Sequence, residues 1–309
     1  SGMLPGYISG HYSFDDVHID LGKLCACAGA RFFHDAVVGI DRERKLVLCR
    51  DRPPVPYDVL SINIGSTPQV QRVEGAAALS VPVKPIARFN QRWLALLEQV
   101  RQWPVQRAPM TVAVVGGGAG GVELVLSMQY RLRNELKALG RNPESLRFVL
   151  FTSSATVLPT HNAGVQRRFA RVLRERGVTV HTGAEVVKVS PGCLHTRDGR
   201  TWDADETLWV TQAGGPAWLQ ATGLSLNKNG FVRVNAQLQT LSDPDVFAAG
   251  DIADFTDRPL EKAGVFAVRM GPPLVNNLRR SLRGQPLVAY TPQRSWLALI
   301  STGDRFAVA

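Results

Sequence analysis

The sequence predicts an α/β fold built on parallel sheets. The strongest observation is that four apolar residues, 112–115, are followed by Gly116, Gly118 and Gly121 in the spacing G-x-G-x-x-G. A run suited to a helix follows, from residue 122 to about residue 138. Strand-like and helix-like segments then alternate along much of the chain, which is the pattern of consecutive βαβ units.

The first 72 residues read as strands joined by turns. Residues 30–41 and 45–49 alternate between apolar and polar side chains, as the two strands of a hairpin do. Residues 57–64 form a buried strand that runs into the turn Gly65-Ser66-Thr67-Pro68. We therefore expect β-structure to dominate this part of the chain.

Helices and strands alternate in the middle of the chain. Apolar residues near a period of 3.6 predict helices over residues 86–103 and 163–176, the first ended by Pro104. Further strands are expected at residues 146–152, 178–181, 206–211, 231–234 and 244–251, with a hairpin over residues 184–202. Such alternation favours a parallel sheet covered by helices.

The last part of the chain reads as a helix followed by two strands. Residues 262–283 have helical periodicity, and we expect Gly271-Pro272-Pro273 to interrupt it. Proline lacks the backbone N–H that a helix interior needs, so an interruption is the ordinary consequence. A final pair of strands is expected to begin near Trp296.

The glycine motif carries a specific chemistry. Gly116 allows the tight turn from strand to helix, Gly118 lets the backbone approach a pyrophosphate, and Gly121 lets the helix pack closely on the strand. The first turn of the helix also offers unpaired N–H groups and a partial positive charge to phosphates. The motif therefore predicts dinucleotide binding, with a glycine-rich turn in another α/β protein as the alternative.

Composition excludes several classes of protein. The chain has 309 residues and 45% hydrophobic content, enough for a large core or two domains. It contains no run of about 18 apolar residues, so no membrane-spanning helix is expected. Four cysteines and no recognisable signal peptide favour a reducing, cytoplasmic compartment. Cys25 and Cys27 are a redox or metal pair at most, and ordinary packing is the preferred interpretation; no metal site is expected.

The formal net charge of +10 raises the question of an anionic partner. Arg167, Arg168 and Arg171 alternate with apolar residues at helical spacing, which is typical of a solvated helix face. The sequence holds no nucleic-acid-binding motif, so we expect no nucleic-acid partner. The six histidines are scattered and read as structural residues.

Asp245-Val-Phe-Ala-Ala-Gly-Asp251, taken with the glycine motif and the turn at residues 64–68, resembles the flavoproteins with two dinucleotide-binding domains. These form the pyridine nucleotide-disulfide oxidoreductase family, and the type II NADH dehydrogenase branch is the most similar. Within that branch, residues 1–12, 57–68, 262–269 and 299–305 resemble the NADH dehydrogenase-like module that many organisms fuse to selenophosphate synthetase.

The resemblance implies two Rossmann-like, three-layer domains. An FAD-binding-like domain would be discontinuous, formed by residues 1–106 and 237–288, and would lack its first βαβ unit. An NAD(P)-binding domain would occupy residues 107–236, and residues 289–309 would be the remnant of a truncated interface domain.

The resemblance also implies roles for individual residues. Asp251 would accept a hydrogen bond from the ribityl chain of FAD beside Gly250, and Gly65, Ser66, Thr67 and Pro68 would line the same cofactor. The nicotinamide-nucleotide site would be formed by Gly116, Gly118, Gly121 and Glu123. Lys262 and Lys84 are the catalytic candidates, with a surface role as the alternative for each.

Thr152 and Ser153 occupy the end of the strand where an NAD-preferring fold usually places an acidic residue. Without that carboxylate the 2′-phosphate of NADP is not repelled, and Arg167 or Arg168 is a candidate to bind it. This pattern favours NADPH or mixed use.

The chain also departs from the family pattern. The first βαβ unit of the FAD domain and the C-terminal membrane-docking helices are not found in this sequence. A truncated chain is expected, and the alternatives are a gene start placed at Met3 or a diverged protein that has lost the unit. Gln212 stands in place of a family glycine, and Met270-Gly271 in place of a Gln-Gly pair. A parallel sheet that lacks its edge exposes unpaired strands, so we expect poor solubility or a homodimer.

The resemblance implies an FAD-dependent NAD(P)H oxidoreductase, in which hydride passes from NAD(P)H to flavin and on to a small-molecule or protein acceptor. A link to selenium metabolism follows from the fused module. The alternative is a non-catalytic nucleotide-binding module that docks a partner such as selenophosphate synthetase.

Overall fold

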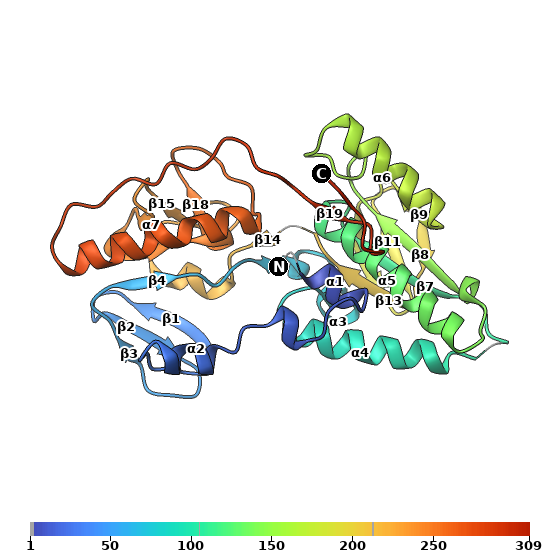
Figure 1. Cartoon of the computed structure of the whole chain (residues 1–309), viewed down its shortest axis with the longest axis horizontal. Coiled ribbons are helices and arrows are strands. Elements are labelled where there is room, and N and C mark those ends of the chain that lie inside the picture. Colours follow the sequence, from blue (N-terminus) through green and yellow to red (C-terminus); the bar gives the residue numbers. More distant parts are fainter. Residues whose placement is uncertain (1–2, 105, 212) are drawn as a thin grey trace. The chain divides into compact units, whose positions relative to one another are not determined.

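The computed structural model describes residues 3–104, 106–211 and 213–309 of the chain (Figure 1). The prediction made for Gln212, and the first two residues of the family-like opening stretch, lie outside these residues. The chain folds into two compact units. Unit 1 contains residues 1–18, 68–212 and 297–309, and unit 2 contains residues 19–67 and 213–296.

Unit 1 is built on a five-stranded parallel sheet in the order β6-β13-β7-β8-β9. The strands are β6 (Val81–Pro82), β7 (Met110–Val115), β8 (Leu146–Phe151), β9 (Val178–His181) and β13 (Glu206–Trp209). The central strand β7 is buried on both faces, which explains why its sequence is a continuous apolar run rather than an alternating one.

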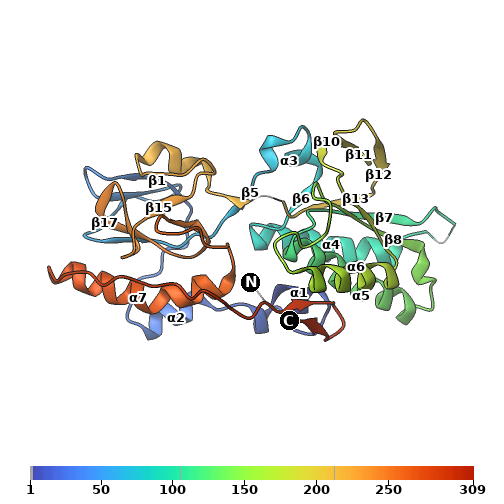
Figure 2. The same cartoon turned by 90° about the horizontal axis from the view of Figure 1, so that it is seen from above.

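Layers cover both faces of this sheet (Figure 2). Helices α4 (Ile86–Gln102), α5 (Ala119–Ala138) and α6 (Ala163–Glu175) lie on one side. On the other side lie α3 (Ala76–Leu79) and a meander of β10 (Val186–Ser190), β11 (Cys193–Thr196) and β12 (Thr201–Asp203). Successive side chains of β7 enter different cores: Val112 and Val114 pack with the helices, and Ala113 and Val115 pack with the meander.

Segments from both ends of the chain complete unit 1. Helix α1 (Leu4–Ile8) and the antiparallel pair β19 (Ile300–Ser301) and β20 (Ala307–Val308) join it, and both α1 and β19 pack against α5. Ile8 and Ile300 are buried in the same core as the helices. The predicted final strand pair therefore exists, and it begins at residue 300 rather than near Trp296.

Unit 2 contains a mixed sheet in the order β18-β15-β16-β17-β4. The strands are β4 (Leu60–Ile62), β15 (Val232–Val234), β16 (Gln239–Thr240), β17 (Asp243–Ala248) and β18 (Ala253–Phe255). Helix α7 (Gly264–Leu282) packs on this sheet through Phe266, Met270 and Leu274. A second sheet of β1 (Val37–Asp41), β2 (Leu46–Cys49) and β3 (Val55–Pro56), together with the 3-10 helix η4 (Ala217–Thr222), forms the opposite layer, so unit 2 is also three-layered.

The remaining elements are short. They are η1 (Asp15–Val17), α2 (Leu21–Cys27), β5 (Thr67–Pro68), η2 (Val70–Arg72), η3 (Pro143–Ser145), β14 (Ala213–Gly214) and η5 (Gly250–Ile252). The predicted α/β class is confirmed, as are the helices expected over residues 86–103 and 163–176 and the hairpin formed by β1 and β2. No helix among the described residues is long and apolar enough to cross a membrane.

Two expectations about secondary structure are wrong. The first 72 residues are not strands and turns alone, because α1 and α2 lie within them. Pro5 sits in the first turn of α1, and the Asp20 side chain accepts a hydrogen bond from the Lys23 N–H at the start of α2. Both are helix-start signals that hydrophobic periodicity alone does not reveal.

The second error concerns helix α7, which continues through Pro272 and Pro273 without interruption. The carbonyl groups that these prolines leave without a helical partner belong to residues 268 and 269, which lie on the exposed side of the helix, where solvent can reach them. The buried side, which carries Phe266, Met270 and Leu274, holds the helix against the sheet.

The compact units differ in extent from the predicted domains. Residues 68–106 pack with the glycine-motif sheet in unit 1, although they were assigned to the FAD-like domain of residues 1–106 and 237–288. Residues 213–236 pack in unit 2, although they were assigned to the domain of residues 107–236. The physical reason is that β6 pairs with β13 and β15 pairs with β18, and the sequence pattern does not reveal such pairings.

Core packing on α5 makes a first prediction. Leu132 is fully buried, and we expect Leu132→Ala to lower the free energy of unfolding by about 2–5 kcal/mol, because it removes buried methyl groups and leaves a cavity. Leu139→Ala at the end of the same helix, where the side chain is 51% exposed, is the control and changes stability by less than about 0.5 kcal/mol. Urea unfolding followed by circular dichroism measures both; equal losses would contradict the assignment.

Candidate dinucleotide-binding site

The glycine motif forms the turn between β7 and α5. Gly116 has a φ of +131°, which side-chain-bearing residues rarely adopt, and its N–H donates to the Phe151 carbonyl at 2.8 Å. A Cβ on Gly121 would lie 1.8 Å from the Gly116 carbonyl oxygen, so the helix can approach the strand only because residue 121 has no side chain. This is the close packing expected of the third glycine in the motif.

Gly118 is different, because a Cβ there would meet no atom within 4 Å. It is the N-cap residue of α5, and no side chain caps the helix at this point. The first turn of a helix has N–H groups without partners inside the helix. The turn thus combines open space beside Gly118 with the N-terminus of a helix of 20 residues.

Thr152 and Ser153 follow β8 at the same edge of the sheet, because β7 and β8 are parallel neighbours. The Thr152 N–H donates to the His181 carbonyl at 3.0 Å, and its side chain is buried against the turn: a Cβ on Gly117 would lie 2.5 Å from the Thr152 Cβ. Ser153 is exposed. The structure therefore brings Thr152 to the glycine turn, with Ser153 next to it at the surface.

Glu123 lies in the first turns of α5 and contacts the C-terminal segment. Its Oε1 accepts a hydrogen bond from the Ser301 N–H at 2.8 Å. Burial raises the pKa of the Glu123 carboxyl, and the hydrogen bond from Ser301 lowers it by a smaller amount. The family resemblance implies that Glu123 belongs to the nucleotide site, whereas its contact with β19 joins residues far apart in sequence and is not predicted by it.

A second group of predicted residues meets in unit 2. Strands β4 and β17 are parallel neighbours, so the segments that follow them lie at one edge of the sheet. There the Ser66 hydroxyl donates to an Asp251 carboxylate oxygen at 3.3 Å. Gly65 and Gly250 both have positive φ, at +69° and +72°, and a Cβ on Gly250 would lie 2.6 Å from Asn63 Oδ1. Thr67 and Pro68 continue from this turn as β5.

The two candidate lysines belong to different units. In unit 2, the Lys262 Nζ donates to the Ala253 carbonyl at 2.5 Å and lies 4.2 Å from the centre of the Phe231 ring. Burial of the amine lowers the pKa of Lys262, while the charges of Asp254 and Asp251 partly offset this effect. Lys84 follows β6 in unit 1 and is half-buried.

Sequence reasoning missed two residues of these turns. Gly117 is also constrained, because the Thr152 side chain occupies the space that its own side chain would need. In unit 2, Asn63 Oδ1 lies where a side chain of Gly250 would begin. Met270 Sδ also accepts a hydrogen bond from the Gly250 N–H at 3.2 Å. The run Gly116-Gly117-Gly118 was a signal in the sequence that could have identified Gly117. The position of Asn63 beside Gly250 results from the pairing of β4 with β17, which the sequence does not show.

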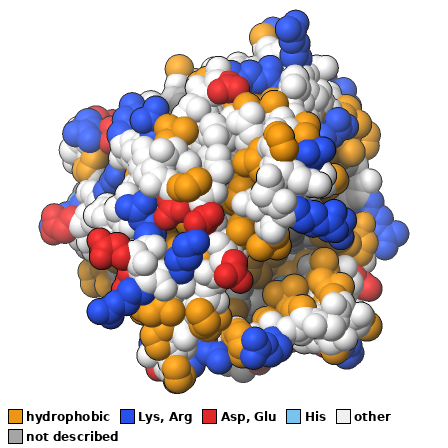
Figure 3. All heavy atoms as spheres, turned by 90° about the vertical axis from the view of Figure 1, so that its left-hand side faces the viewer, with side chains coloured by type: hydrophobic (Ala, Val, Ile, Leu, Met, Phe, Trp, Pro, Cys, Tyr) orange, Lys and Arg blue, Asp and Glu red, His pale blue; other side chains and the backbone are white. Residues whose placement is uncertain are grey.

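Neither the face shown in Figure 3 nor the metal-ligating side chains of the described residues mark a further site. On the face shown in Figure 3, lysine and arginine side chains are scattered among acidic and hydrophobic ones. All four cysteines are free. Within residues 3–104, 106–211 and 213–309, no three His, Cys, Asp or Glu side chains gather where they could hold a metal ion.

The two glycines of the turn are expected to respond differently to alanine. Gly121→Ala forces a methyl group against the Gly116 carbonyl, so we expect a loss of about 1–3 kcal/mol in the free energy of unfolding. Gly118→Ala enters open space and costs less than about 1 kcal/mol through weaker capping. Thermal unfolding of both variants measures the difference; similar losses would show that the turn has another geometry.

The Glu123 carboxyl predicts a pH dependence. Its pKa lies above 4.5 in the folded chain, so the folded state favours the protonated form and loses stability as the pH rises through that folded pKa. Glu123→Gln keeps an oxygen for the Ser301 N–H without the buried charge. We expect the variant to gain stability over the parent at pH 7, and the gain to shrink as the pH falls toward 4.5. Urea unfolding at several pH values checks this, and a gain that grows at low pH would contradict it.

The chain is similar to several characterised proteins. It is 27% identical over 257 residues to the type II NADH:quinone oxidoreductase of Haemophilus influenzae, covering 72% of this chain and 57% of that protein. It is 26% identical over 278 residues to an NADH dehydrogenase-like protein of Mycobacterium tuberculosis, covering 88% of this chain and 68% of the relative. The chain thus spans a little over half the length of the Haemophilus protein.

Solved structures share the fold. The sulfide:quinone oxidoreductase of Aquifex aeolicus superposes with a TM-score of 0.77 at 19% identity, covering 98% of this chain and 72% of that one. The NDH2 protein of Plasmodium falciparum, solved in complex with NADH, gives a TM-score of 0.73 at 17% identity and covers 82% of this chain and 57% of that one. The predicted pair of Rossmann-like units is therefore confirmed as a fold.

The sequence profile of the pyridine nucleotide-disulphide oxidoreductases matches residues 24–277, which is more than half of the chain. Members of this family use FAD and a pyridine nucleotide, so the predicted enzyme class and cofactors are those of the family. On this match, the chain belongs to the pyridine nucleotide-disulphide oxidoreductase family.

Proposed function

We propose that this chain supplies the nucleotide-binding units of an FAD-dependent NAD(P)H oxidoreductase of the NADH dehydrogenase type. The observation that carries the proposal is the turn at Gly118, where open space meets the uncapped N-terminus of α5. A pyrophosphate fits such a turn, because it accepts hydrogen bonds from backbone N–H groups and gains from the helix dipole. The family of the chain and its NADH-related relatives support the same activity.

Unit 1 would hold NAD(P)H. The backbone at Gly116 to Gly121 would bind the pyrophosphate, and the hydroxyls of Thr152 and Ser153 would face the ribose. Neither residue carries a negative charge, so a 2′-phosphate is not repelled there. We therefore propose that both NADPH and NADH bind, with NADPH favoured.

Unit 2 would hold FAD at the edge where Ser66 and Asp251 meet. The Asp251 carboxylate would accept a hydrogen bond from a ribityl hydroxyl, and Gly250 would let the backbone come close. Lys262 is the proposed catalytic residue of this unit. Its amine is held by the Phe231 ring and the Ala253 carbonyl, and it feels the charge of Asp251. Lys84 is proposed as a second candidate in unit 1.

The chemistry would come from the two cofactors. When bound, FAD and NAD(P)H would supply hydride transfer and the onward passage of electrons to an acceptor. The residues of this chain bind and orient: backbone N–H groups hold phosphates, Asp251 fixes a hydroxyl, and the Lys262 ammonium supplies a positive charge near Asp251. Catalysis of this kind depends on positioning, because the protein contributes no covalent step.

The acceptor is proposed by class. The Haemophilus relative is named as a quinone oxidoreductase, so we propose a quinone-like acceptor, with a protein acceptor as the alternative. A selenium-linked role beside selenophosphate synthetase rests on the sequence resemblance alone. The proposed cytoplasmic location rests on the cysteine content and the lack of a recognisable signal peptide, and the proposed homodimer rests on the sheet edge expected to be exposed. A non-catalytic module that docks such a partner remains the second candidate.

One spectroscopic experiment separates the two candidates. The purified chain is incubated with FAD, desalted and then mixed anaerobically with NADPH or NADH. We expect retained flavin absorption that bleaches with either nucleotide, and faster with NADPH. Retention without bleaching by either nucleotide would favour the docking module, because it would show a bound cofactor without hydride transfer.

Asp251→Asn is the matched test of the FAD site. It preserves the size of the side chain and an oxygen acceptor but removes the charge, so we expect weaker FAD retention, roughly tenfold in Kd, with an unchanged fold. Asp254→Asn, a neighbour outside the Ser66 contact, is the control and should retain FAD like the parent. Equal effects of the two variants would argue against a specific role for Asp251.

A further inference from the structure

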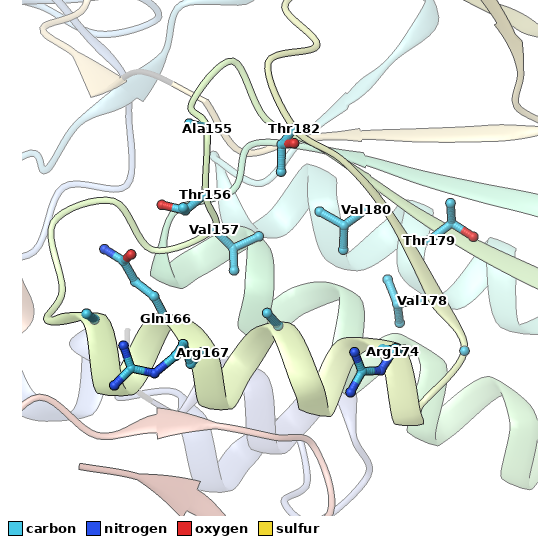
Figure 4. A pocket seen from close by; sticks show the side chains of 13 residues that line it. Ala155, Thr156, Val157, Gln166, Arg167, Arg174, Val178, Thr179, Val180 and Thr182 are labelled. Carbon is cyan, nitrogen blue, oxygen red and sulfur yellow. The ribbon is translucent and has the colours of Figure 1, made fainter.

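Unit 1 has a cavity away from the glycine turn. It is a groove of about 700 Å³ between α6 and the edge strand β9 (Figure 4). Val157, Val178, Val180 and Ala170 give it an apolar wall. Its volume lies within the range of sites for small organic ligands, which are mostly apolar with a few placed polar groups.

The groove reaches past the edge of the sheet. Val178, Thr179 and Val180 are consecutive residues and all line it, although neighbouring side chains of a strand point to opposite faces. Among the described strands, β9 pairs only with β8, so its other edge is open. A ligand in the groove would therefore contact the side of α6 that carries Ala163, Gln166 and Ala170, together with the outer side of β9.

Two arginines mark the helix side of the groove. Figure 4 shows Arg167 beside Gln166 at one end and Arg174 beneath Val178 at the other. They are seven residues apart on α6, which is about 10 Å along the helix axis. Within the described residues neither arginine has an ion-pair partner, whereas Arg171 on the same helix lies 3.9 Å from Glu175.

None of the groove residues belongs to the turn at Gly116–Gly121, and neither Thr152 nor Ser153 lines it. The groove thus offers an elongated apolar surface with one unpaired cation near each end. That arrangement is complementary to a molecule with an apolar body and an acidic group at each end.

We propose that this groove is a binding site for an elongated amphipathic dianion of the dicarboxylate class. One carboxylate binds Arg167, the other binds Arg174, and the hydrocarbon body lies against Val157, Ala170 and Val180. The charge-assisted hydrogen bonds to the two guanidinium groups set the orientation, and burial of the body adds affinity. Arg167, which the sequence offers as a ligand for a 2′-phosphate, is assigned here to the dianion, and competition with NADPH separates the two roles.

Isothermal titration calorimetry of the full chain with sebacate tests the proposal. Sebacate is a straight-chain dicarboxylate; the matched probes are caprate, with one carboxylate, and the uncharged diol of the same length. We expect sebacate to bind more tightly than caprate by about tenfold, and caprate more tightly than the diol. Caprate binding as tightly as sebacate would overturn the two-ended site, and so would the absence of sebacate binding.

Arginine variants locate the site. Arg167→Gln and Arg174→Gln should each weaken sebacate binding by about tenfold, while Arg171→Gln, which removes the same charge from the same helix, should leave it unchanged. Ala170→Trp should abolish binding by filling the groove; this residue is exposed, so the fold is expected to tolerate the change, and circular dichroism checks it. Equal weakening of sebacate binding by all three glutamine variants would show that the helix attracts anions through its overall charge, and it would overturn the proposal.

Two further binding experiments test alternative occupants of the groove. Displacement of sebacate by NADPH would assign Arg167 to the nucleotide site and overturn the proposal; unchanged sebacate binding at saturating NADPH supports it. Binding of an acidic extended peptide at the groove without binding of sebacate would show strand addition to β9 and would also overturn it. Because calorimetry reads binding alone, the outcome does not depend on flavin retention or bleaching.

Discussion

The structure of unit 1 depends on one steric constraint, which is the approach of α5 to the end of β7. The Gly116 carbonyl oxygen occupies the position where a side chain of residue 121 would begin, only 1.8 Å from an ideal Cβ. Because of that approach, the next turns of α5 can bury Val122, Val125 and Leu126 completely. Helix α1 and strand β19 pack on this same helix, so segments from both ends of the chain rely on the turn.

The same reasoning applies to the two candidate sites. Parallel neighbouring strands end at one edge of a sheet, and the turns that follow them are brought together whatever their separation in sequence. In unit 1 this places Thr152 against Gly117, and in unit 2 it places Ser66 against Asp251. The second pair is separated by 185 positions in the chain, and the pairing of β4 with β17 is what joins it.

Local pattern was enough to predict much of this fold. β7 and α6 follow from an apolar run and from helical periodicity, since both signals are contained in one segment. The hydrogen bond between Ser301 and Glu123 could not be predicted from the sequence. It joins residues 178 positions apart, and its donor is a backbone N–H, which is present whatever the residue type. The predicted interruption of α7 is wrong for a related reason. The sequence shows that residue 272 is proline, but it does not show that this side of the helix is exposed.

The glycines of the turn separate into two kinds by what surrounds them. Gly117 and Gly121 are required by the chain itself, since Thr152 and the Gly116 carbonyl fill the space where their side chains would lie. Gly118 has an ordinary φ of −76° and nothing within 4 Å of an added Cβ, so neither conformation nor packing accounts for a glycine there. A serine or aspartate would cap α5 better than glycine does. A bound pyrophosphate would supply the missing reason, because it needs the space and the N–H groups that a capping side chain would take.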